Sequence, residues 1–293
     1  MAKLLTGREA AAALTAALQR RTDALTERGV TPKLAILRCG ENESDGAYLR
    51  SAQQRAALCG VAVEVSSLPE TVSRTALLAA IDGVNRDASV HGCLLLRPLP
   101  AHLRDVENAI CNRLLPEKDV DGMTDVSAAG VYLGRSAGFA PCTAEAVTVL
   151  LDHYGIDCTG KRAVVIGRSP VVGRPAAMLL LERNATVTVC HTRTQALSDV
   201  TREADIIVSA AGAAGCLTAA HGAVLCGRKV SAADHSRFLP ISEPHPGHRV
   251  RCHYGGIPHG GKAEELWLYL GGSCPVLLKY HLRGAEAAEN LAS

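Results

Sequence analysis

The chain has 293 residues, of which 47% are hydrophobic and 20% are charged; this composition supports two packed domains and excludes a disordered chain. The formal net charge of +2 at pH 7 leaves no extended basic face, which argues against nucleic acid or an acidic membrane as a partner. Because no apolar run approaches the roughly 20 residues that span a bilayer and no secretory signal opens the chain, we expect a soluble cytoplasmic protein.

Helix and strand patterns alternate through the first 210 residues and predict an α/β fold with mainly parallel sheets. Helices are expected from Thr6 to Gly29, from Ser44 to Gly60 and from Ser73 through Ile81, and strands over residues 33–37, 61–65 and 90–96. The sequence RPLP at 97–100 then leaves the sheet as an extended loop, because its two prolines cannot donate to a strand ladder.

Periodicity is lost around residues 134–141, and this predicts the boundary between a first domain, 1–139, and a second domain, 140–270. In the second domain Thr143 is expected to cap a helix that runs to about Tyr154. Strands are then predicted over residues 163–166, 186–190 and 205–210, and helices over 172–183 and 196–203. A last segment, 271–293, is predicted to hold a final helix from Val276 to Asn290.

The sequence VVIGRSPVVGRP at 164–175 predicts a strand, a glycine turn and the start of a helix, the layout of a Rossmann-type nucleotide site. Gly167 allows the tight turn, and Gly173 lets helix and strand approach closely. The helix start then offers free N–H groups and a positive dipole to a pyrophosphate. Ser169 stands where the middle glycine of G-x-G-x-x-G usually lies, so an ordinary strand-to-helix turn is an alternative.

The end of the next strand distinguishes between nicotinamide cofactors. An NAD site usually has an acidic residue about twenty residues past the glycines, where it holds the ribose hydroxyls. Here the sequence is CHTRT at 190–194, with Arg193 in place of an acid and Arg168 as a second cation. Two guanidinium groups suit a 2′-phosphate, which favours NADP; two solvated surface arginines are the alternative. His191 is interpreted as a strand-end histidine and not as a catalyst.

A charged loop, KDVDG at 118–122, is by itself typical of a solvated turn. Together with Tyr48, the RPLP loop, the Pro-Cys-Thr sequence at 141–143 and the glycine turn at 164–175, it makes the chain resemble the methylenetetrahydrofolate dehydrogenase/methenyltetrahydrofolate cyclohydrolase family, the FolD-type proteins. The resemblance covers residues 1 to about 223 and resumes at Gly271.

This resemblance implies two αβ domains facing across a cleft, with tetrahydrofolate derivatives on the first domain and NADP on a Rossmann-type second domain. It also implies a homodimer and a last helix that returns to the first domain. The pterin-binding aspartate maps to Asp121, which can accept two N–H bonds, and the tyrosine that stacks on or orients the folate maps to Tyr48. Further folate contacts map to Gly271, Gly272 and Pro275. The NADP contacts map to Gly167, Arg168, Ser169, Gly173, Thr192 and Arg193.

Two positions depart from the family in a way that separates its two reactions. The family has a lysine four residues after the tyrosine, where this chain has Ala52, and a glutamine before the Pro-Leu-Pro loop, where it has Leu96. Hydride transfer from methylenetetrahydrofolate needs mainly alignment, whereas hydrolysis of the methenyl product needs proton transfer. We therefore predict a dehydrogenase without the cyclohydrolase step. Two alternatives are a bifunctional enzyme in which Arg55 replaces the lysine, and a non-catalytic folate- or nucleotide-binding dimer.

Residues 226–270 depart further, because the family's aspartate-valine-glycine strand is absent after Val224 and its last loop survives only as GGSCP at 271–275. A remodelled loop and a local reading-frame slip in the gene both fit this departure. The histidines of this segment match no zinc spacing, so no metal is expected; they are His235, His245, His248, His253 and His259. The eleven cysteines lack a CxxC pair and are expected to be reduced thiols.

Overall fold

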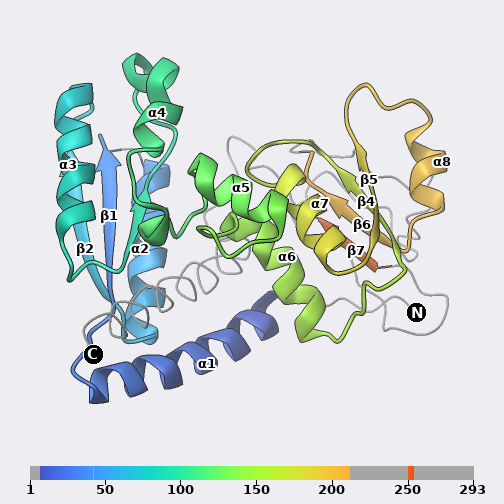
Figure 1. Cartoon of the computed structure of the whole chain (residues 1–293), viewed down its shortest axis with the longest axis horizontal. Coiled ribbons are helices and arrows are strands. Elements are labelled where there is room, and N and C mark those ends of the chain that lie inside the picture. Colours follow the sequence, from blue (N-terminus) through green and yellow to red (C-terminus); the bar gives the residue numbers. More distant parts are fainter. Residues whose placement is uncertain (1–6, 42, 212–249, 254–293) are drawn as a thin grey trace. The chain divides into compact units, whose positions relative to one another are not determined.

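The computed structural model describes residues 7–41, 43–211 and 250–253, and they form two compact units (Figure 1). Residues 11–142 form the first unit, and residues 7–10 with 143–211 and 250–253 form the second. All strand pairs in the described residues are parallel, so the predicted α/β fold class is confirmed. No helix of these residues is long and apolar enough to cross a membrane.

The first unit has a three-stranded parallel sheet in the order β2-β1-β3. Its elements are α1 (Gly7–Glu27, whose first turn belongs to the second unit), β1 (Lys33–Cys39), α2 (Glu43–Leu58), β2 (Ala62–Leu68), α3 (Arg74–Arg86), β3 (Gly92–Leu95), η1 (Ala101–Val106), α4 (Glu107–Cys111), η2 (Pro116–Lys118) and α5 (Asp125–Leu133). Since β1 lies between its two neighbours, the chain reverses its winding direction there, and ligands of open α/β sheets bind at the carboxyl ends of such strands.

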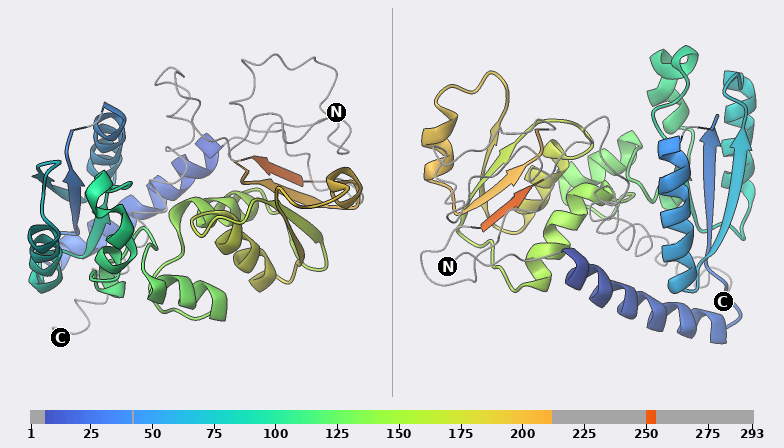
Figure 2. Two further views of the ribbon diagram at one scale, coloured as in Figure 1. Left: turned by 90° about the horizontal axis from the view of Figure 1, so that it is seen from above. Right: turned by 180° about the vertical axis from the view of Figure 1, so that it is seen from behind.

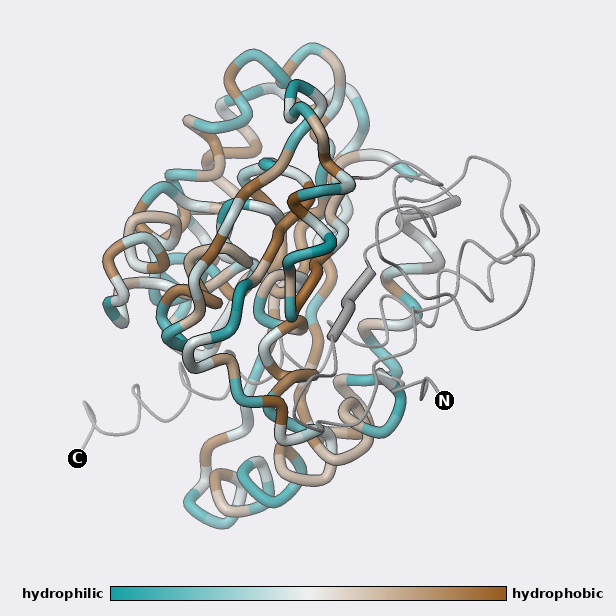
Figure 3. The backbone as a smooth tube through the Cα atoms, turned by 90° about the vertical axis from the view of Figure 1, so that its right-hand side faces the viewer, coloured by the Kyte–Doolittle hydropathy of each residue, from teal (hydrophilic) through white to brown (hydrophobic). Residues whose placement is uncertain are grey.

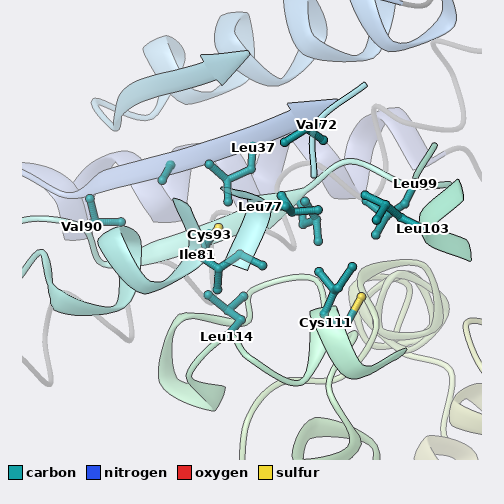
Figure 4. Close-up of a cluster of buried hydrophobic side chains, with 13 residues drawn as sticks. Leu37, Val72, Leu77, Ile81, Val90, Cys93, Leu99, Leu103, Cys111 and Leu114 are labelled. Carbon is teal, nitrogen blue, oxygen red and sulfur yellow. The ribbon is translucent and has the colours of Figure 1, made fainter. Parts of the chain in front are cut away.

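One face of this sheet is covered by α3 and α4, and Figure 4 shows the cluster that joins them. Leu37 of β1 and Cys93 of β3 point toward Leu77 and Ile81 of α3, and all four are almost fully buried. Helix α2 lies on the other side of the sheet (Figures 1 and 2). Ser73 caps α3 as expected, because its side chain accepts the amide of Ala76; the helix continues five residues beyond Ile81, to Arg86.

The second unit has a four-stranded parallel sheet in the order β5-β4-β6-β7. Its elements are α6 (Cys142–His153, whose first residue belongs to the first unit), β4 (Arg162–Ile166), α7 (Gly173–Glu182), β5 (Thr186–Cys190), α8 (Leu197–Arg202), β6 (Ile206–Ser209) and β7 (Val250–His253). The two central strands, β4 and β6, are almost completely buried; Figure 3 shows the hydropathy of each residue along the backbone. The sequence showed no element at β7, which adds an outer strand beside β6.

The prediction that Thr143 caps α6 is wrong. The helix begins at Cys142, so Thr143 lies within its first turn. Among the described residues, seven cysteines are free and six of these are buried. Burial raises the pKa of Cys93 to about 12 and that of Cys111 to about 11, so both stay neutral at physiological pH.

Candidate functional site

At the carboxyl edge of the first sheet, two loops bring an arginine against an aspartate. The amide of Leu96 donates to the carbonyl of Leu37 at 2.9 Å and extends the pairing of β1 with β3 by one residue. The KDVDG loop runs beside β3, because Asp119 forms a parallel bridge with Cys93. Two residues later, the Oδ2 atom of Asp121 lies 3.3 Å from a guanidinium nitrogen of Arg97. Both side chains keep about a quarter of their surface exposed, 24% for the arginine and 26% for the aspartate.

The first aspartate of the KDVDG loop is a buried anchor. Asp119 is fully buried, and its Oδ1 atom accepts the amide of Met123 at 3.0 Å. Its Oδ2 atom accepts the amide and hydroxyl of Thr124, at 2.8 and 2.7 Å, and the hydroxyl of Ser127 at 2.6 Å. Four donors therefore satisfy this carboxylate and attach the loop to the start of α5.

The rest of the loop is fixed as firmly. The ammonium group of Lys118 donates to the carbonyls of Val84, Asn85 and Asp87, at 2.7, 3.1 and 2.7 Å, and so ties the loop to the end of α3. Gly122 has a φ of +66°, and a Cβ atom there would lie 2.6 Å from the carbonyl oxygen of Phe139, so only glycine fits. The interpretation of KDVDG as a solvated turn is therefore wrong.

Asp121 is the aspartate of this loop that stays partly exposed, at 26%. Burial raises the pKa of the Asp121 carboxyl to about 6, and the negative charge of Asp119 also raises it. The guanidinium of Arg97 and a hydrogen bond from the Cys142 thiol act in the opposite direction and lower that pKa. The carboxyl is thus mostly ionised at pH 7 and can accept N–H bonds from a ligand.

Helix α2 carries the other predicted folate residue of the first unit. It follows the carboxyl end of β1, and Tyr48 lies in its second turn with a half-buried ring. Ala52, one turn further along the same face, is only 3% exposed, and the neighbouring Ser51 is 2% exposed with a hydroxyl that has no hydrogen-bond partner. Leu96 is half-buried at the end of β3. Neither Ala52 nor Leu96 can transfer a proton.

In the second unit, the two glycines of the turn after β4 have the roles that the sequence predicts. Gly167 has a φ of +124°, and a Cβ atom there would lie 2.7 Å from the carbonyl carbon of Ala210. At Gly173 a Cβ atom would overlap the carbonyl group of Gly167. The start of α7 therefore approaches the end of β4 more closely than any other residue would permit.

The amides at the start of α7 are not free, which corrects part of the sequence interpretation. The hydroxyl of Ser169 accepts the amides of Val172 and Gly173, at 3.1 and 3.4 Å, and its carbonyl accepts the amide of Arg174 at 3.1 Å. Pro175 has no N–H group. Ser169 therefore satisfies this helix start internally, and an anion is left with the exposed turn at residues 168–171 and the cations around it.

Two such cations lie at one edge of the sheet. Strands β4 and β5 are parallel neighbours in which Ile166 pairs with Cys190, so Arg168 and Arg193 follow the ends of adjacent strands. Both arginines are exposed, and neither has an ion pair or side-chain hydrogen bond within the described part of the chain. Thr192 is exposed beside them.

His191 shapes the turn that carries Arg193. Its ring Nδ1 atom accepts the amide of Arg193 at 3.1 Å, and its own amide donates to the hydroxyl of Thr194 at 2.8 Å. These contacts place the histidine in the turn as a structural residue, in keeping with its interpretation as a strand-end histidine.

Several predicted residues lie outside the described residues. They are Gly271, Gly272 and Pro275, the final helix, and the histidines after residue 226 apart from His253, which belongs to β7. Within the described ranges, no three histidine, cysteine or acidic side chains come together in a way that could hold a metal ion.

Comparison with known proteins assigns the chain to a family. Residues 5–121 match the catalytic domain of tetrahydrofolate dehydrogenase/cyclohydrolase, and residues 141–225 match the NAD(P)-binding domain of the same family. A bifunctional protein FolD from Alkaliphilus oremlandii is 45% identical over 212 residues, 72% of this chain and 74% of the relative. The chain belongs to the tetrahydrofolate dehydrogenase/cyclohydrolase family.

Solved structures of this family agree with the assignment. The bifunctional FolD enzyme from Campylobacter jejuni superposes with a TM-score of 0.78 at 31% identity, covering 97% of this chain and 98% of the other. The Trypanosoma brucei FolD, solved with NADP cofactor and an inhibitor, gives a TM-score of 0.77 at 29% identity, covering 98% of each chain. The predicted resemblance is confirmed. The match to the NAD(P)-binding domain ends at residue 225, next to the predicted departure after Val224.

Two residues of the site at the carboxyl edge of the first sheet, Asp119 and Arg97, were not predicted from the sequence. Asp119 was grouped with the other charges of its loop, although its burial distinguishes it. Arg97 was considered only as part of an extended loop, and its ion pair with Asp121 depends on the bridge between residues 93 and 119. An arginine directly after a buried apolar strand was the one signal in the sequence that could have drawn attention to it.

Proposed function

We propose that this member of the family oxidises 5,10-methylenetetrahydrofolate to 5,10-methenyltetrahydrofolate with NADP and lacks the cyclohydrolase step. The observation that carries the proposal is the side chain at position 52. The family has a lysine there, whereas Ala52 offers a methyl group that is 3% exposed. Leu96 replaces the glutamine of the family at the end of β3. The lysine that would transfer protons during hydrolysis and the glutamine that would support it are therefore both missing.

The dehydrogenase step asks less of these residues. NADP, when bound, accepts the hydride at its nicotinamide ring. The folate nitrogens stabilise the cation left behind, so the protein has to bind and align the substrate without a general base. In this proposal Asp121 accepts the N–H groups of the pterin edge and Tyr48 orients the ring. Hydrolysis needs an activated water and proton transfers worth typically 10²–10⁴-fold in rate.

The preference for NADP rests on charge. Arg168 and Arg193 follow adjacent strand ends, are exposed and have no partner among the described side chains. Residues 190–194 contain no acid that would hold the ribose hydroxyls of NAD. Two available guanidinium groups suit a 2′-phosphate, to which arginine binds with paired N–H bonds. The NAD(P)-binding match of residues 141–225 and the NADP-bound relative support the same choice.

The test is a paired assay on the full chain that follows NADPH formation and methenyltetrahydrofolate decay separately. We expect NADPH to form while the methenyl product accumulates and decays at its uncatalysed rate. Acceleration of that decay by the unmodified protein would overturn the dehydrogenase-only proposal. Absence of NADPH formation, with folate and NADP still bound, would instead favour a non-catalytic binding protein, which the departure of residues 226–270 from the family motivates.

A bifunctional enzyme is the second candidate, because several relatives at 40–45% identity carry the name bifunctional protein FolD. In that case another group on α2 has to replace the lysine, and Arg55, half-buried in the last turn, is the nearest cation one turn beyond Ala52. Arg55→Ala would then remove the hydrolysis of the methenyl product and leave NADPH formation in place.

The assembly and location are proposed from the family alone. We propose a cytoplasmic homodimer. Light scattering coupled to size-exclusion chromatography tests the dimer, since a mass of one 30.7 kDa chain would exclude it.

A further inference from the structure

Arg97 is held in place by the segment that follows it. Leu99 is 1% exposed, and its amide donates to the carboxylate of Glu107 at 3.1 Å. The side chain of Arg104 reaches back to the carbonyl of Leu99 at 3.4 Å. The backbone next to Arg97 is thus fixed on the sheet edge, and the guanidinium meets the Oδ2 atom of Asp121 from a defined direction.

We infer that Arg97 is a positioning residue for Asp121: through its contact with one carboxylate oxygen, Arg97 keeps Asp121 in the charged form that accepts N–H bonds from the pterin. This inference rests on the proposed function, in which Asp121 binds the folate. The geometry that carries it is the 3.3 Å contact between two side chains that each keep only about a quarter of their surface exposed. A pair with so little access to water is screened less than a surface salt bridge.

The surroundings of Asp121 leave Arg97 as its nearest compensating charge. Asp119 adds a negative charge that raises the pKa of Asp121, and four hydrogen bonds keep Asp119 from moving away. The thiol of Cys142 contributes one hydrogen bond but no positive charge. Two further ionisable groups interact within this cluster, and neither adds a positive charge. Glu107 is acidic, and the Cys111 thiol has a pKa of about 11 and stays neutral.

The sign of the effect follows from these charges. The pKa of Asp121 is about 6 with Arg97 in place, and Arg97 lowers it. Without the guanidinium, burial and Asp119 act alone, so the midpoint moves up by about one pH unit, the lower end of the range for a neighbouring opposite charge. At pH 6 the ionised fraction then falls from about one half to about one tenth, and folate binding weakens about fivefold; above pH 8 the variant regains wild-type binding.

The experiment compares Arg97→Leu with the wild type in the full chain. Tetrahydrofolate binding is measured by calorimetry under reducing conditions from pH 5.5 to 8.5, together with KM and kcat for methylenetetrahydrofolate. We expect a higher pH midpoint for binding and KM and little change in kcat at pH 8.5. Arg97→Lys, which keeps a positive charge, should bring the midpoint back toward the wild type. Arg113→Leu removes the ion pair with Asp82 in the same unit and should leave the midpoint unchanged.

Asp121→Asn separates failure of this inference from failure of the proposed function. Asparagine cannot ionise, so the pH dependence near 6 should disappear and tetrahydrofolate binding should be weak at every pH. If Asp121→Asn binds tetrahydrofolate like the wild type, Asp121 is not the pterin anchor and the proposed function fails at this residue. If Asp121→Asn weakens binding but Arg97→Leu keeps the wild-type midpoint, the role of Arg97 is overturned. A uniform loss of affinity in Arg97→Leu at all pH values contradicts it equally, because that would be a structural effect alone.

Discussion

The variants Asp119→Asn and Asp121→Asn should differ in their effects, because Asp119 stabilises the fold whereas Asp121 is proposed to bind the folate. Asp119 accepts four hydrogen bonds in a fully buried site, with three donors on Oδ2 and the amide of Met123 on Oδ1. An asparagine keeps a single acceptor oxygen. If that oxygen receives the three donors, its NH₂ group faces the Met123 amide at about 3.0 Å, donor against donor. The reverse orientation opposes three donors.

The cost can be estimated from these contacts. Leaving one buried donor unsatisfied costs about 1–3 kcal/mol, and the bonds that remain lose the extra strength of a charged acceptor. Breaking such a buried network typically costs about 3 kcal/mol or more. For a domain of this size each kcal/mol lowers the melting temperature by about 2–4 °C, so Asp119→Asn should lower it by about 6–12 °C.

The assay is thermal unfolding of the full chain, followed by circular dichroism, with Asp121→Asn as the matched control. At Asp121 burial already disfavours the charge, so that variant should melt within about 2–4 °C of the wild type while tetrahydrofolate binding weakens and NADP binding stays intact. An Asp119→Asn protein with a wild-type melting temperature would refute the reasoning, because the four hydrogen bonds would then contribute nothing to stability.

Two further predictions concern the second unit. Arg193→Ala should weaken NADP binding at least tenfold and NAD binding far less, since a charge-assisted bond contributes roughly 1.5–3 kcal/mol. The control is Arg202→Ala, which removes an exposed ion pair with an aspartate. Equal weakening of both cofactors would exclude binding of the 2′-phosphate by Arg193. Gly173→Ala should destabilise the chain by about 1–3 kcal/mol, because the added Cβ would overlap the Gly167 carbonyl. Gly83→Ala, in open space on α3, should be neutral or slightly stabilising. Similar melting curves for the two variants would contradict the close approach of α7 to the end of β4.

The regular elements could be predicted from the sequence wherever one local pattern decided them. Strand β5 was predicted residue for residue, Thr186–Cys190, from its run of β-branched residues. Helix α7 was predicted to within one residue at each end, because an apolar helical period follows the glycine turn. Strand β7 could not be predicted, since it forms beside β6 in a segment without a period of its own. Helix α5, nine residues long, was missed although local residues set both of its ends, the N-cap Thr124 and the left-handed Gly134.

Some residues of the candidate site could likewise be predicted from the local sequence, and others could not. The glycines at 167 and 173 follow from local geometry, and the structure gives them the predicted roles. The roles of the charged residues in KDVDG do not follow from local geometry, because the local sequence does not show which carboxylate is buried. That depends on donors at residues 123–127 and on carbonyls at 84–87, which only the folded chain brings to the loop. At the start of α7 the local pattern was misleading. It predicted free amides, whereas the Ser169 hydroxyl accepts the amide of Val172.

The placement of the two proposed functions explains how one could be lost without the other. Asp119 and Lys118 hold the loop of Asp121 in place, and Glu107 holds the segment after Arg97 through the amide of Leu99. None of these contacts involves position 52. A lysine at position 52 would have to lie in surroundings where Ala52 is only 3% exposed, and such burial lowers the pKa of an ammonium group. That lowered pKa suits proton transfer and also destabilises the fold. In the proposed function, alanine removes this cost together with the proton transfer, and the loops still align the substrate for hydride transfer.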